Sequence, residues 1–146
     1  MSASTELLDY IYKNAGMGVE SIGKLLEETE NDDFKSFLSE QYADYKNICN
    51  SCEDVAKDKS HTLKDLGTFS KLETDMMIEL KTLGDKTPDS MAGMLMQGSI
   101  MGIVQSIRRI KQYESDCDSE VKNIAQKLLK IEERNIQECP KWLGVQ

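Results

Sequence analysis

Apolar side chains recur about every 3.6 residues in each long segment of the chain, and no stretch alternates strictly between apolar and polar residues as a half-buried strand does. This pattern predicts an all-α protein. The expected helices cover about residues 6–28, 33–57, 69–83, 88–113 and 119–139. The four longer ones would each be roughly 33 to 40 Å long. Helices of matched length favour a bundle.

Local signals predict where these helices begin and end. Ser4 and Thr5 are good caps for the first helix, because their hydroxyls can accept a hydrogen bond from a free backbone N–H. Thr87 is a similar cap, and Pro88 follows at the first helical position, where a missing N–H does no harm. Pro140 removes a backbone donor and should end or kink the last helix.

Connection lengths predict how the helices are joined. The turns at residues 29–33 and 115–118 are short enough to force antiparallel helix pairs. Residues 58–87 are long enough to cross the whole bundle and include the short predicted helix. We therefore expect one domain, residues 1–146, built as two helical hairpins joined by a long crossover.

The segment 88–113 differs from the other long helices because it is apolar on two faces. One stripe consists of Met96, Ile100, Ile103, Ile107 and Ile110. The opposite stripe consists of Met91, Met94, Gly98, Met101 and Gly102. We expect the isoleucine stripe to face the core, and the Met/Gly stripe to be covered by the short helix or by a second copy of the protein. Alternatively, the Met-lined face accepts a partner helix or an apolar ligand.

Net charge and targeting signals narrow the class of protein. The formal charge is −8 and the pI is near 4.7, which argues against non-specific nucleic-acid binding. No segment resembles a signal peptide or a membrane-spanning helix, so we expect a cytoplasmic protein that does not bind membranes. Four unevenly spaced cysteines are too few for a disulfide scaffold.

Several polar residues fall at one depth of the predicted bundle when positions are counted from the turns. Gln41, Glu132 and Asn135 point toward the core by helical phase. Gln97 lies at the flank of this level, and Glu20 lies at the same depth but nearly opposite its helix's apolar stripe. The sequence therefore predicts a buried polar layer.

These positions give the chain a resemblance to the ferritin-like superfamily, in which two glutamates and two Glu-x-x-His motifs bind two iron or manganese ions. Glu132-x-x-Asn135 lies where one such motif would be, Gln97 and Glu20 lie near the levels of the lone glutamates, and the second helix offers Gln41. The resemblance implies a ferritin-like scaffold. No long helix contains a histidine, so a hydrogen-bonded network that includes Tyr45 is the favoured interpretation, with an iron or manganese site as the alternative.

A second candidate site lies at one end of the predicted bundle. Cys49-x-x-Cys52, His61 and Cys117 could together provide four zinc ligands. The cysteine pair lies late in a helix, away from the helix N-terminus that lowers thiol pKa in redox motifs. Buried apolar packing is therefore the favoured interpretation of the two cysteines.

The sequence contains no phosphate-binding glycine loop and no Ser-His-Asp candidate. We therefore expect a non-catalytic ferritin-like bundle that acts through self-association, as a homodimer, or through binding to another protein. The alternative is a metal-binding or metal-dependent protein similar to ferritin or rubrerythrin, with iron, manganese or zinc.

Overall fold

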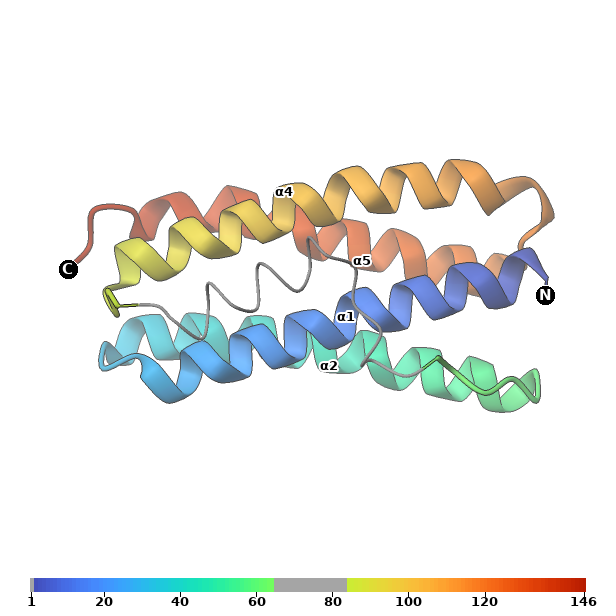
Figure 1. The fold of residues 1–146 in the computed structure, drawn as a ribbon, viewed down its shortest axis with the longest axis horizontal. Coiled ribbons are helices and arrows are strands. Elements are labelled where there is room, and N and C mark those ends of the chain that lie inside the picture. Colours follow the sequence, from blue (N-terminus) through green and yellow to red (C-terminus); the bar gives the residue numbers. More distant parts are fainter. Residues whose placement is uncertain (1, 65–83) are drawn as a thin grey trace.

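The computed structural model describes residues 2–64 and 84–146 and shows an all-α four-helix bundle (Figure 1). The long helices are α1 (Ala3–Glu28), α2 (Asp32–Asp58), α4 (Pro88–Tyr113) and α5 (Ser119–Glu138), with short 3₁₀ turns at η1 (Glu114–Asp116) and η2 (Cys139–Trp142). These bounds confirm the four long helices that the apolar period predicts. The short helix expected at 69–83 lies outside the described residues. Of the helices that the structure describes, none is long and apolar enough to cross a membrane.

The helices form two antiparallel hairpins, α1 with α2 and α4 with α5 (Figure 1). α2 and α4 run in the same direction (Figure 1). Each hairpin packs on the other through α2 against α5 and α1 against α4. The two predicted antiparallel hairpins are confirmed, whereas most of the predicted crossover, residues 65–83, lies outside the described residues.

Side chains cap the N-termini of α1, α2 and α4, and one of these caps differs from the prediction. Ser2, not Ser4 or Thr5, caps α1: its backbone is extended, and its Oγ accepts from the backbone N–H of Thr5 at 3.1 Å. Ser4 lies inside the helix and is buried. Thr87 caps α4 as predicted, accepting from the N–H of Ser90 at 3.2 Å.

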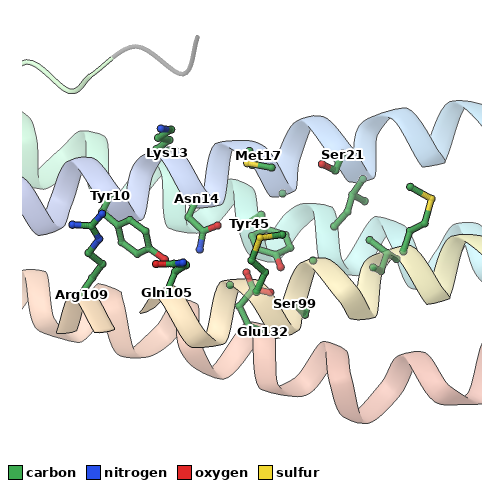
Figure 2. A pocket seen from close by; sticks show the side chains of 17 residues that line it. Tyr10, Lys13, Asn14, Met17, Ser21, Tyr45, Ser99, Gln105, Arg109 and Glu132 are labelled. Carbon is green, nitrogen blue, oxygen red and sulfur yellow. The ribbon is translucent and has the colours of Figure 1, made fainter. Parts of the chain in front are cut away.

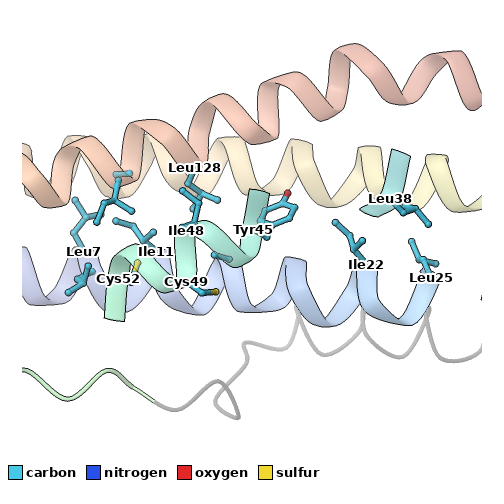
Figure 3. Close-up of a cluster of buried hydrophobic side chains, with 14 of the residues drawn as sticks. Leu7, Ile11, Ile22, Leu25, Leu38, Tyr45, Ile48, Cys49, Cys52 and Leu128 are labelled. Atoms are coloured by element: carbon cyan, nitrogen blue, oxygen red, sulfur yellow. The ribbon is translucent and has the colours of Figure 1, made fainter. Parts of the chain in front are cut away.

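Much of the apolar core is formed by side chains of α1 and α2 that face the inside of the bundle (Figure 3). The buried side chains on these two helices include Leu8, Ile11, Ile22, Leu25, Phe34, Leu38, Ile48 and Cys52. Beyond α5, the Trp142 ring packs edge-on against Phe34 with centroids 5.1 Å apart. The backbone N–H of Gly144 donates to Asp89 Oδ1 at 2.7 Å. The C-terminal segment thus joins the start of α4 to the start of α2.

The orientation of α4 is opposite to the prediction. The isoleucine stripe faces outward, with Ile100 50% exposed and Ile107 39% exposed; only Ile110 in that stripe is buried. The buried face instead carries small residues, notably Ser99, Gly102 and Ser106. At Gly102 a Cβ atom would meet the side chain of Glu132 on α5. The segment 69–83, expected to cover the Met/Gly stripe, lies outside the described residues.

Candidate functional site

A hydrogen-bonded polar layer crosses the core at the predicted depth. Gln41 Nε2 donates to Asn135 Oδ1 at 3.0 Å, and Asn135 Nδ2 donates to the Tyr45 hydroxyl at 3.1 Å. The same Nδ2 lies 3.4 Å from Ser99 Oγ. All four side chains are buried. The expected meeting of Gln41 and Asn135 is confirmed, and Ser99 is a member that helical phase alone did not predict.

Glu132 lies next to this layer and is only 4% exposed. Burial raises the pKa of its carboxyl to about 7, while hydrogen bonds from Ser99 and Tyr45 act in the opposite direction. Its Oε2 atom is buried and has no hydrogen-bond partner among the described residues. Burial also raises the pKa of Tyr45 well above its usual value, with the nearby Glu132 as a further cause. Tyr45 therefore remains a hydroxyl donor at neutral pH.

Two glycines provide the space for these polar side chains. A Cβ atom at Gly102 on α4 would lie 3.0 Å from Cδ and Oε1 of Glu132. A Cβ atom at Gly18 on α1 would lie 2.7 Å from the Tyr45 ring. The carboxyl group of Glu132 therefore packs closely against the α4 backbone at Gly102.

A cavity of about 380 Å³ opens between α1 and α4 (Figure 2). Glu132, Tyr45 and Ser99 line it on the side of the core. Its apolar lining includes Met17, Ile22, Met94, Leu95 and Met101. Its polar lining includes Tyr10, Lys13, Asn14, Ser21, Gln105 and Arg109. The arrangement combines an apolar compartment with a fixed, buried carboxyl group.

Asn14 supplies a second buried polar atom in this lining that lacks a partner. Its Nδ2 atom is buried and makes no hydrogen bond in the part of the chain that the structure describes. Arg109, farther along the cavity, lies over the Tyr10 ring at 5.5 Å from the centroid. The cavity therefore presents hydrogen-bonding groups at more than one point along its length.

The remaining residues of the predicted iron or manganese site lie apart from the layer. Glu20 on α1 and Gln97 on α4 are exposed, whereas Gln41, Glu132 and Asn135 are buried together. Within residues 2–64 and 84–146, no group of three or more His, Cys, Asp or Glu side chains is placed to hold a metal ion. The binding of iron or manganese at the polar layer therefore stays a prediction.

The four predicted zinc ligands do not come together as a metal-binding set in the part of the chain that the structure describes. His61 Nε2 lies 2.8 Å from Oδ1 of Asp9, a buried residue of α1 that the sequence pattern did not single out. Cys49 and Cys52 are buried in the core, and burial raises the pKa of Cys52 to about 12. Its thiol is therefore protonated at neutral pH and is a poor nucleophile. Cys117 is half-buried.

In comparisons with known proteins, no family model, no curated protein and no solved structure gives a significant match to this chain.

Proposed function

We propose that this protein binds a small amphipathic molecule in the cavity between α1 and α4 and acts as a non-catalytic binding protein. The observation that carries this proposal is Glu132, a buried residue that lines the cavity and whose Oε2 has no hydrogen-bond partner among the described residues. A buried polar atom without a partner is costly, and a ligand donor at this position would remove that cost.

The size and lining of the cavity support the same proposal. Pockets for small molecules enclose about 300 to 1,000 Å³ and combine apolar walls with a few polar groups that orient the ligand. The cavity here is about 380 Å³. Met17, Met94 and Met101 contribute flexible, polarisable side chains that adapt to different apolar shapes.

The test is the uptake of a neutral, environment-sensitive apolar dye by the full-length protein. We expect Leu95→Trp to reduce dye fluorescence strongly, because Leu95 lines the cavity. Val104→Trp is the matched control, since Val104 lies on the same helix but is 42% exposed and outside the cavity lining. Circular dichroism checks that both variants remain folded. Equal dye uptake by the two variants, or none by the unmodified protein, would overturn the proposal.

A second candidate function, self-association as a homodimer, is favoured by the outer surface of α4. Ile100, Val104 and Ile107 form an apolar strip along this helix with exposed fractions of 50%, 42% and 39%. Contiguous exposed apolar surface is typical of association sites. Sedimentation velocity should show a dimer that Ile100→Glu converts to monomer, whereas Gln97→Glu on the same helix has no effect. A monomer at all concentrations would eliminate this function.

We also infer that the scaffold is ferritin-like, because two antiparallel hairpins are joined so that α2 and α4 run in the same direction. On that scaffold, iron or manganese binding near Glu132 and Asn135 is the alternative function. Metal analysis of untagged protein distinguishes this metal-binding function from the proposed binding of an amphipathic molecule. We expect well below one equivalent of metal, and two equivalents together with oxidation of ferrous iron would favour the metal function.

A further inference from the structure

We propose that the cavity selects an organic cation, an alkylammonium group whose N–H donates to Oε2 of Glu132 while its apolar body lies against Met94 and Leu95. This inference rests on the proposed binding function and adds the chemical class of the ligand. It follows from three features of the cavity: its missing counter-ion, the fixed position of its carboxyl group and the character of its walls.

The first feature is that Glu132 has no cationic partner in the described structure. The groups that shift its pKa are its own burial, Ser99 and Tyr45. The two cations of the cavity lining, Lys13 and Arg109, are not among them. A buried carboxylate without a counter-ion is strongly destabilising. A ligand that brings a positive charge into the cavity should therefore bind more tightly than a neutral or negatively charged ligand of the same size.

The second feature is that the carboxyl group is held in place before any ligand arrives. Ser99 and Tyr45 both hydrogen-bond to it, and the α4 backbone at Gly102 leaves room for it and little more. Its Oε2 still lacks a donor. A hydroxyl group can donate to the carboxylate but brings no charge, whereas an ammonium both donates to the carboxylate and neutralises its buried negative charge. A ligand carboxylate would be repelled.

The third feature is the contrast between this carboxyl group and the walls beside it. Met17, Met94 and Leu95 line the cavity and offer contacts only to an apolar body. A small inorganic cation would leave these walls without a contact, and with one carboxyl group it would also lack the oxygen ligands that such ions need. An alkyl chain that carries one ammonium group satisfies both parts of the cavity.

Ammonium binding should also be coupled to the loss of a proton from Glu132. Burial raises the pKa of this carboxyl to about 7, and an ammonium partner favours the ionised form. Affinity for an amine should then rise with pH up to about 7, by at most tenfold per pH unit, and level off above it. The other ionisable groups facing the cavity are Tyr10, Lys13, Tyr45 and Arg109.

The experiment is isothermal titration calorimetry of the full-length protein with three probes that share one alkyl chain: octylamine, octan-1-ol and octanoate. Near about pH 8 we expect octylamine to bind at least about tenfold more tightly than octanol, and octanoate to bind most weakly. Glu132→Gln should bring octylamine to the affinity of octanol and leave octanol binding unchanged. Glu133→Gln, at the exposed neighbouring position, is the matched control.

The possible outcomes separate this inference from the proposed function. If the three probes bind equally, or octanoate binds best, the pocket is a binding site but its selectivity for cations is refuted. If none binds, the proposed function fails and this inference fails with it. Should Glu132→Gln not fold, the pH profile of the unmodified protein decides instead. Octylamine affinity that rises toward about pH 7 while octanol affinity does not supports the inference, and parallel profiles refute it.

Discussion

The buried carboxyl group of Glu132 should make the stability of the protein depend on pH, and Glu132→Gln should remove that dependence. Burial raises the pKa of this group from 4.5 to about 7 in the folded protein. Below about pH 4 the carboxyl is protonated in both the folded and the unfolded chain. Between the two pKa values only the unfolded chain ionises readily, so the folded state becomes less stable as the pH rises.

The size of this effect follows from the two pKa values. Each factor of ten in proton affinity corresponds to about 1.36 kcal/mol, so the contribution of Glu132 to the free energy of unfolding should fall by about 3 kcal/mol between about pH 4 and pH 8. The side chain is 4% exposed, so solvent screening reduces this value little. Glutamine does not titrate. Its buried amide adds an offset that is the same at every pH.

The assay is urea unfolding of the unmodified protein and of the variant at several pH values. The difference between their free energies of unfolding should change by about 3 kcal/mol in favour of the glutamine variant as the pH rises, with most of the change below about pH 7. Glu133→Gln should show no comparable trend, because Glu133 is exposed. A difference that stays constant with pH would refute the buried, unpaired state of Glu132.

Two further changes test the packing around the site, each measured by chemical unfolding. Gly18→Ala should lower the free energy of unfolding by about 1–3 kcal/mol, because the added methyl group would lie 2.7 Å from the Tyr45 ring, whereas Gly23→Ala on the same helix should raise it by about 0.5–1 kcal/mol. Trp142→Ala should lower it by about 2 kcal/mol through loss of aromatic packing at the end of the bundle, while Gln146→Ala at the exposed end of the same segment should change it by less than about 0.5 kcal/mol.

Local signals were sufficient to predict the elements of this fold. The N-cap at Thr87 and the apolar period placed four long helices to within a few residues. Counting from the turns was also sufficient to bring Gln41 and Asn135 to one depth, because straight helices of known rise keep their register. These predictions needed no information about contacts between distant parts of the chain.

The orientation of α4 and the cavity depend on contacts that the pattern does not encode. Both stripes of α4 are apolar, so the period alone does not say which one faces inward. The inward face is set by the room that Gly102 leaves for Glu132 and by Ser106, whose Oγ lies 3.4 Å from the Tyr10 hydroxyl. The cavity lies between α1 and α4, which are far apart in the sequence. In the sequence, the feature that pointed to this cavity was the stripe of Met and Gly residues along α4.

The polar layer contains two kinds of residue, and they should respond differently when they are made apolar. Asn135 accepts a hydrogen bond from Gln41 at its Oδ1 and donates one to Tyr45 from its Nδ2. These bonds connect α5 with α2 and are a sufficient structural reason for a buried asparagine. Glu132 brings a charge into the core and leaves one oxygen unpaired. Fixing the register of the helices does not require that oxygen to be buried without a partner.

We therefore expect Asn135→Leu to lower the free energy of unfolding by about 1–3 kcal/mol, because it leaves buried polar groups unsatisfied. Glu132→Leu should raise the free energy of unfolding near about pH 8, because a leucine of similar size removes a buried charge that has no counter-ion. The same variant should lose its preference for octylamine. If Glu132→Leu instead destabilises the protein as much as Asn135→Leu does, then Glu132 serves the register of the bundle, and the argument for a ligand at this carboxyl group fails.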